Sequence, residues 1–158
     1  MLIVDSREKW TQSDQAKPGH NVRNHFHKHK VDYTVQKLEV GDYMYPDGKV
    51  RVDRKQSLQE LATNLMNRSD SARFWREVRR ARELGIKLIV LIEQGGAYHS
   101  IRDVAGWKSQ YSPVTGRKLM EEMTRLELAY GVRFVFCDKR STGKKILELL
   151  KEEQEDEQ

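Results

Sequence analysis

Two aspartates and a lysine, separated by a turn signal, are the residues of this chain whose types and spacing best suit catalysis. Asp42 follows a glycine, and Asp53 and Lys55 flank an arginine further along. Carboxylate oxygens are the hard ligands that Mg²⁺ prefers. A metal held by them polarises a phosphodiester and lowers the pKa of a bound water, while a lysine can orient that water or offset charge at the phosphate. The three residues therefore indicate metal-assisted cleavage of a phosphodiester bond.

The residues between these groups predict a β-hairpin. Residues 43–45 form a short strand signal, residues 46–48 (Pro-Asp-Gly) have turn composition, and residues 49–55 alternate valines with polar residues as a returning strand. Proline sets φ in such a turn, and glycine supplies a positive φ. A hairpin of this length brings Asp42 beside Asp53.

Side chains alternate between the two sides of the returning strand, and this alternation divides the three charged residues at its end. Asp53 and Lys55 are two positions apart, so they point to the same side of the strand, and Arg54 points to the other. We therefore expect Arg54 to form a structural ion pair or a contact with a nucleic-acid backbone. A charged triplet alone is a weak signal because 34% of the residues are charged, and the preceding Gly-Asp pair and hairpin strengthen it.

Three short motifs, taken in order, resemble a known nuclease family. Residues 1–8 are MLIVDSRE, residues 38–43 are LEVGDY, and residues 52–55 are VDRK. This order resembles the nuclease domain of the XPF family of structure-specific DNA endonucleases, whose pattern is D-x-R-E, then G-D-Y, then an acid-R-K triplet. That family belongs to the restriction-endonuclease-like PD-(D/E)XK superfamily. Three separated motifs in one order are far more specific than one triplet.

The resemblance extends over nearly the whole chain, except for a segment from about residue 95 to 116 and the tail. Arg73 and Phe74 stand where the family has an Arg-Leu pair that opens a helix. Residues 88–93 (LIVLIE) match the next strand, and residues 128–136 (LAYGVRFVF) match a later passage from helix to strand.

The chain also departs from the family pattern. Asp53 stands where the family usually has glutamate, and Gln59, followed by Glu60, stands where it often has aspartate. The helix-hairpin-helix DNA-binding repeats of many relatives are not found in these 158 residues, so we expect a stand-alone nuclease domain.

The resemblance implies an endonuclease that requires Mg²⁺ or Mn²⁺ and cuts branched or flap-type DNA, leaving 5′-phosphate and 3′-hydroxyl ends, in repair or recombination. Asp5 has an alternative role in an Asx turn or helix cap, and Glu8 could instead pair with Arg7 or Lys9 at the surface. The expected catalytic residues are Asp42, Asp53, Lys55, Asp5 and Glu8; the expected metal ligands are Asp42, Asp53 and Asp5; the expected nucleic-acid contacts are Arg7, Arg54 and Arg73.

Two other functions remain open. The domain could be a non-catalytic DNA-binding or dimerisation module of the same fold, or a PD-(D/E)XK nuclease that acts on another nucleic acid, such as RNA or a linear DNA end. A decayed member should have lost Asp42, Asp53 or Lys55, and all three are present. Besides DNA, the resemblance implies a homodimer or a DNA-binding partner protein. Apolar residues of the late helices offer a surface for it: Leu119, Met123, Leu126, Tyr130, Ile146 and Leu150.

Composition and length favour one domain, at residues 1–150, and an acidic, disordered tail at 151–158. The 29 Lys and Arg against 24 Asp and Glu give a net charge of +5, which suits a polyanionic partner. The single cysteine, Cys137, leaves no disulfide framework or Cys-based zinc site within the chain. No signal peptide or membrane-spanning apolar run is found, so we expect a cytoplasmic protein without a membrane partner.

Apolar spacing predicts the elements that must position these residues. Strands first in a meander and then in βαβα order predict an α/β fold, with a mixed sheet flanked by helices, and the resemblance implies the restriction-endonuclease-like version of it. The expected strands cover residues 2–4, 31–38, the hairpin, 86–92 and 132–137; the expected helices cover about 21–29, 58–65, 74–81, 119–130 and 142–151.

Two further segments carry weaker signals. Four histidines lie between His20 and His29, and His25 and His29 would share a helical face that can bind zinc. Because no third ligand is obvious there, we favour a solvated or phosphate-contacting helix. The segment Gln94–Lys118 carries aromatic and basic residues that could stack on unpaired bases, cap the core or cover a dimer surface.

Overall fold

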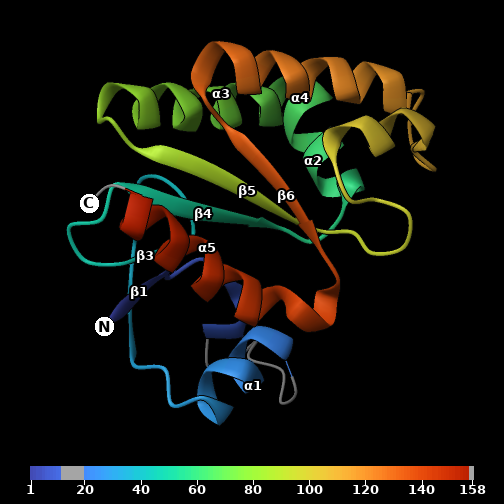
Figure 1. The fold of residues 1–158 in the computed structure, drawn as a ribbon. Helices are drawn as coiled ribbons and strands as arrows, with labels where there is room; N and C mark the ends of the chain where they lie inside the picture. The colour runs from blue at the N-terminus through green and yellow to red at the C-terminus, as the bar shows by residue number, and fades with distance from the viewer. Residues whose placement is uncertain (12–19, 157–158) are drawn as a thin grey trace.

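A six-stranded mixed sheet lies between two layers of helices in the computed structural model of this protein (Figure 1). The structure describes residues 1–11 and 20–156, with side chains described to residue 152. One layer covers one face of the sheet with three helices, and the other layer has two. The first layer contains α2 (Leu58–Met66), α3 (Arg68–Glu83) and α4 (Gly116–Tyr130), and the second contains α1 (Asn21–Lys28) and α5 (Thr142–Asp156).

The sheet has the order β2-β1-β3-β4-β5-β6. The pairs β1–β2, β4–β5 and β5–β6 are parallel, whereas β3 is antiparallel to both of its neighbours. The mixed α/β sheet flanked by helices is confirmed. The strands are β1 (Leu2–Asp5), β2 (Tyr33–Gln36), β3 (Tyr43–Met44), β4 (Val50–Lys55), β5 (Lys87–Glu93) and β6 (Arg133–Cys137).

Strand β5 shows why the sheet is buried on both faces. Leu88, Val90 and Ile92 pack into the core beneath α2, α3 and α4, whereas Ile89 and Leu91 pack into the core beneath α1 and α5. Successive side chains of a strand point to opposite faces, so a nearly continuous apolar run is what a strand covered on both sides requires. This central strand therefore fixes the position of β4, its hydrogen-bonded neighbour.

The β3–β4 turn differs in one detail from the sequence-based expectation. The turn is closed by a hydrogen bond from the amide of Gly48 to the carbonyl of Tyr45 at 3.0 Å. The left-handed residue is Asp47, with φ of 62°, and not the glycine. Aspartate tolerates this conformation because its short side chain can bond to nearby backbone, so the turn forms with Asp47 in that position.

The apolar surface that was expected on α4 and α5 to support dimerisation is not exposed. Leu119, Met123, Leu126, Ile146 and Leu150 are at most 1% exposed, because they form the packed side of α4 and α5. That prediction was wrong for these residues: the same helical spacing marks a core face. Helix α5 also continues to Asp156, past the end expected near residue 151, and residues 157–158 lie outside the described residues. Disorder of the 151–158 tail stays a prediction.

Among the described residues, none of the helices combines the length and apolar character that crossing a membrane requires.

Candidate active site

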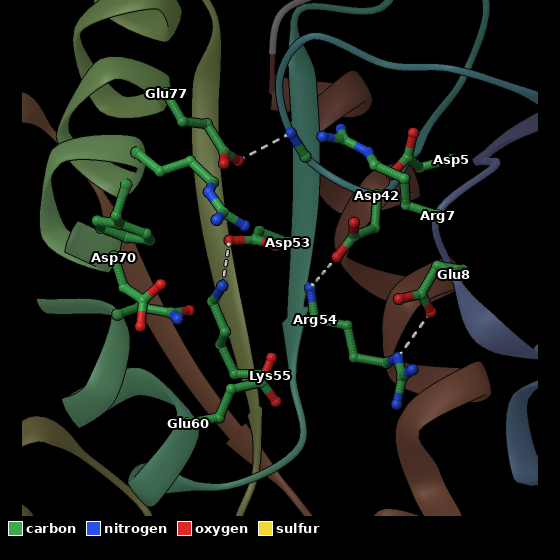
Figure 2. Close-up of a pocket in the computed structure, with 14 residues that line it drawn as sticks. Asp5, Arg7, Glu8, Asp42, Asp53, Arg54, Lys55, Glu60, Asp70 and Glu77 are labelled. Atoms are coloured by element: carbon green, nitrogen blue, oxygen red, sulfur yellow. Dashed lines mark hydrogen bonds and ion pairs between the residues drawn. The ribbon is translucent and has the colours of Figure 1, made fainter. Parts of the chain in front are cut away.

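A pocket of about 280 Å³ collects the predicted site residues from four separate parts of the chain. It lies where the end of β1, the β3–β4 hairpin and helices α2 and α3 meet (Figure 2). All eight residues expected to carry catalysis or DNA contacts line it: Asp5, Arg7, Glu8, Asp42, Asp53, Arg54, Lys55 and Arg73.

The hairpin brings Asp42 next to Asp53, as its length predicted. The amide of Asp42 donates a hydrogen bond to the carbonyl of Val52 at 2.8 Å, and the amide of Arg54 donates to Asp42 Oδ2 at 2.8 Å. The two bonds lie on either side of Asp53, so the register of β4 sets the distance between the carboxylates. Figure 2 shows both aspartates facing the same pocket.

Lys55 lies on the same side of β4 as Asp53, again as predicted. Its Nζ is 3.3 Å from Asp53 Oδ2, and it also lies 5.4 Å from the centre of the Phe74 ring. Burial alone would lower the pKa of Lys55, but the negative charges of Asp53 and Asp42 outweigh it and raise the pKa above its ordinary value. The lysine therefore remains an ammonium ion and a hydrogen-bond donor at neutral pH.

Asp42 lies in an environment that disfavours its ionised form. Burial, followed by repulsion from Asp53 and Glu8, raises the pKa of Asp42 well above its ordinary value, against the opposing effect of the Arg54 amide. Asp53 Oδ2 is buried and has no hydrogen-bond partner among the described residues; its neighbour is the Lys55 ammonium. Two crowded carboxylates and an unbonded buried oxygen form a site whose energy a cation would lower.

The donor set fits a hard divalent cation. Asp42 and Asp53 offer carboxylate oxygens, which suit Mg²⁺ or Mn²⁺ better than softer metals. Among the described residues, no group of three or more His, Cys, Asp or Glu side chains is arranged to hold a metal by itself. Mg²⁺ commonly uses one or two carboxylates and completes its shell with water and substrate phosphate, so a two-carboxylate site is sufficient for it.

Asp5 differs from the other two expected metal ligands because both of its carboxylate oxygens are already bonded. Oδ1 accepts a hydrogen bond from the amide of Leu38 at 2.9 Å, and Oδ2 accepts one from Arg7 Nε at 2.8 Å. The Arg7 side chain also donates to the Leu38 carbonyl at 2.6 Å and remains 60% exposed. Asp5 therefore holds the Arg7 side chain at the edge of the pocket through bonds that are neither an Asx turn nor a helix cap, because its backbone partner is the amide of the distant Leu38.

Glu8 and Arg54 form a buried ion pair beneath the pocket. Arg54 Nε donates to Glu8 Oε2 at 2.8 Å, and Arg54 Nη1 donates to Glu93 Oε1 at 2.6 Å. The hydroxyl of Tyr43 and the indole N–H of Trp10 also donate to Glu8 Oε2, at 2.5 and 3.1 Å. The Arg54 side chain is 4% exposed, so the structural ion pair is the alternative that the geometry supports, and a contact with a DNA phosphate is not. The alternative of a surface ion pair between Glu8 and Arg7 or Lys9 is wrong, because Glu8 is buried and pairs with Arg54.

Helix α3 adds a carboxylate that the sequence did not predict. Glu77 lines the pocket and accepts a hydrogen bond from the amide of Gly41 at 3.0 Å (Figure 2). Gly41 has φ of 75°, and a Cβ there would lie 2.8 Å from Cβ of Arg51. Burial, followed by repulsion from Asp53, raises the pKa of Glu77 to about 7. Its presence could be found only from tertiary packing, because α3 has many charged residues.

The acids and amides of the two adjacent helices complete the pocket. Glu60 lies in the first turn of α2: its amide donates to the N-cap residue at Ser57 Oγ at 3.1 Å, and its Oε2 accepts from the amide of Gln56, the residue before the cap, at 2.8 Å. Gln59, at the family's acidic position, instead accepts a hydrogen bond from Ser109 Oγ at 2.7 Å. Asn64 and Asp70 line the pocket and were also missed.

The two weaker sequence signals have different outcomes. The rings of His25 and His29 lie 4.3 Å apart, but they do not join a group of three metal-ligating side chains within the described residues. In the segment Gln94–Lys118, Trp107 packs against the core beneath α2, α3 and α4, whereas Tyr111 is 82% exposed. Core packing therefore accounts for Trp107, as it does for Tyr98 of the same segment, but not for Tyr111.

Comparison with known proteins decides the family. The model of the ERCC4 domain matches residues 4–150. The chain belongs to the ERCC4 domain family. Among solved structures, this ERCC4 domain is similar to XPF from Aeropyrum pernix, with 21% identity and a TM-score of 0.67 over 97% of this chain and 64% of that chain. It is also similar to XPF from Aeropyrum pernix in complex with DNA, with 21% identity and a TM-score of 0.66 over 98% and 65% of the two chains.

These matches confirm the resemblance found in the motifs and show an XPF-like fold. The ERCC4 domain described here spans about 64–65% of the length of the solved chains that it matches. A search of curated proteins found no match.

Proposed function

We propose that this ERCC4 domain is an endonuclease that hydrolyses phosphodiester bonds in DNA with the help of Mg²⁺ or Mn²⁺. The observation that carries the proposal is the convergence of Asp42, Asp53 and Lys55 in one pocket, with Lys55 Nζ 3.3 Å from Asp53 Oδ2. A non-catalytic module would not need two mutually repelling carboxylates and a buried lysine, because their burial costs stability.

Asp42 and Asp53 are the residues that would hold the cation. When bound, it supplies electrostatic stabilisation of the phosphate and lowers the pKa of a water. The raised pKa of Asp42 supports this assignment, because a positive ion would relieve the repulsion that makes its ionisation unfavourable. Asp5 contributes indirectly, since both of its oxygens are bonded to Leu38 and Arg7.

Lys55 acts as a donor in this proposal. Its pKa is raised, so its ammonium group can orient an attacking water or stabilise charge that develops on the phosphate, but it does not accept the proton of that water. Glu8 has a supporting role: its ion pair with Arg54 anchors the strand from which Asp53 and Lys55 project. Arg7 and Arg73 line the pocket and are exposed, which supports a role for both in binding phosphates.

The substrate proposed is branched or flap-type DNA, and the products are 5′-phosphate and 3′-hydroxyl ends. The test is incubation of the purified protein with flap, fork, junction and duplex DNAs of the same sequence, in Mg²⁺, in Mn²⁺ and in EDTA. Asp53→Asn is the matched inactive control, and end-labelling identifies the termini. Cleavage of RNA or of free duplex ends alone would favour the alternative nuclease. Salt-dependent DNA binding without cleavage in either metal would favour the non-catalytic module.

A homodimer, or assembly with a DNA-binding protein, is also proposed, because a domain of this size has a small DNA footprint and should bind weakly. Light scattering at high micromolar concentration tests it, and a monomer that cleaves DNA with full efficiency would contradict it. The proposed location is the cytoplasm, in keeping with one free cysteine, Cys137.

A further inference from the structure

Helix α3 uses its arginines in two ways. Arg80 has acidic partners, with Glu39 Oε2 and Glu83 Oε2 each 3.4 Å away, and Arg82 lies over the ring of Tyr130 at 5.3 Å. The four other arginines of α3 have no ion-pair or ring partner within residues 1–11 and 20–152, and all are exposed; besides Arg68 at the start of the helix, three of them are spaced by three residues. We call these residues the arginine row: Arg73, Arg76 and Arg79.

The arginine row forms a continuous track that begins in the pocket. Residues three apart on a helix are surface neighbours, with Cβ atoms about 5–6 Å apart. Arg73 lines the pocket, and each step of three residues turns the row further around the helix. The buried side of α3 is formed by Phe74, Val78 and Ala81, so Arg76 and Arg79 lie toward solvent.

Like charges at this spacing destabilise a helix, and no acid of the described residues lies within ion-pair distance of these three arginines. The contrast with Arg80 and Arg82 shows that acids and rings are available along this same helix. An unrelieved row of guanidinium groups fits a ligand that brings regularly spaced negative charges, and guanidinium is the side-chain group best suited to phosphate. A row that starts beside the aspartate pair and leads away from it describes a path for a strand.

We propose that the arginine row binds the phosphodiester backbone of the DNA strand on one side of the cleaved bond. This inference rests on the proposed function. It adds a DNA-binding role for Arg76 and Arg79, and it states the path of the bound strand, which runs from the pocket along α3. These contacts position DNA without reading its sequence.

The test compares three variants in a nuclease-inactive Asp53→Asn background. The first is Arg76→Gln/Arg79→Gln, the second is Arg76→Lys/Arg79→Lys, and the third is Lys139→Gln/Arg140→Gln. Lys139 and Arg140 are exposed in the 3₁₀ helix η3 (Lys139–Ser141), which contacts α1 and α5 in the opposite layer, so the third variant loses the same charge elsewhere. Glutamine is a good helix former, so α3 is retained, and circular dichroism verifies it.

The measured quantity is the slope of log Kd against log salt concentration, from fluorescence anisotropy with a labelled forked DNA. Each lost phosphate contact lowers the slope by about 0.9, so the slope of the first variant should be about 1.8 below that of the parent protein. The lysine variant keeps its charges, so its slope should stay close to that of the parent. The Lys139/Arg140 variant should keep the parent slope. An equal loss in the first and third variants, or no loss in the first, overturns the proposal.

The binding assay separates this inference from the proposed activity. If wild-type protein binds DNA through the arginine row but never cuts it, the proposed endonuclease activity is wrong and the proposed binding role of the row is supported. If wild-type protein cuts DNA and the slope of the first variant equals that of the parent, the binding role of the row is wrong and the proposed endonuclease activity is supported. Absence of salt-dependent DNA binding by the parent protein also overturns the row.

Discussion

The carboxylate of Glu77 accepts a hydrogen bond from the backbone amide of Gly41 at 3.0 Å, which ties helix α3 to the residue before Asp42. The helix therefore contacts the segment that carries Asp42 through one acid, in addition to its apolar packing. The same acid lies close enough to Asp53 for their charges to repel, so the contact that orders the site also opposes ionisation there.

The first prediction concerns pH and Glu77. Its pKa is about 7 in the folded protein, against 4.5 for an ordinary glutamate, so the unfolded chain releases this proton first as pH rises. The stability that this group contributes is complete below about pH 4.5 and is lost as pH rises through about 7, by about 3 kcal/mol in total. Glu77→Gln can keep the bond to Gly41 without this loss.

Urea denaturation in EDTA at pH 5 and pH 8 measures the effect. The free energy of unfolding of Glu77→Gln, relative to that of wild type, should be higher at pH 8 than at pH 5. An identical pH dependence of the two proteins would contradict the assigned pKa of Glu77.

The second prediction concerns the metal-dependent reaction. Asp53→Asn should reduce cleavage by at least about 10²-fold, because stabilisation of the phosphate by a metal contributes several kcal/mol. Cleavage rates on the best DNA substrate, with excess EDTA as a second control, measure it. Full activity in EDTA, or wild-type rates in the variant, would show that the site lies elsewhere.

The third prediction concerns stability without metal. Burial, followed by repulsion from Asp53 and Glu8, raises the pKa of Asp42, so its ionisation destabilises the fold as pH rises through that raised pKa. Asp42→Asn can still accept the hydrogen bond of the Arg54 amide, and it should be at least as stable as wild type in EDTA.

Mn²⁺ should separate the two proteins further. At about a hundredfold over its dissociation constant it should stabilise wild type by about 2.7 kcal/mol, and the Asp42→Asn variant should lose most of this gain. Thermal melts of both proteins with and without Mn²⁺ provide the measurement. Strong destabilisation of Asp42→Asn in EDTA would instead make Asp42 a structural turn residue, and an equal Mn²⁺ gain would place the metal elsewhere.

The fourth prediction separates two arginines of the pocket. Arg54→Met removes the partner of two buried carboxylates, Glu8 and Glu93, and should destabilise the fold by about 3–5 kcal/mol. Arg7→Gln changes a side chain that is 60% exposed, so it should cost about 1 kcal/mol or less while weakening DNA binding. Denaturation curves and anisotropy test both. Unchanged stability of Arg54→Met would contradict the structural assignment.

Local chain geometry explains why part of the site could be predicted from sequence. Asp42, Asp53 and Lys55 belong to one hairpin, so turn signals and strand alternation determined their meeting before any tertiary packing was known. Glu77 and Asp70 reach the pocket only because α3 packs across the sheet, and nothing in a charged helix distinguishes the acid that faces a site from one that faces water.

The same limit explains the error in the dimer surface. Leu119 and Ile146 have the spacing of an amphipathic helix, and that spacing shows that one face is apolar without showing what covers it. In this fold the sheet covers both helices, so residues expected at an interface are core residues. Arg54 was better constrained, since alternation already turned it away from Asp53.

The place of β1 inside the sheet, next to the edge strand β2, has a consequence for synthesis of the protein. This first strand pairs on one side with β2 and on the other with β3, both of which leave the ribosome later. The pocket also needs α3, which ends at Glu83. A growing chain that ends before α3 lacks Asp70, Arg73 and Glu77, so the pocket can be complete only after this helix has been made.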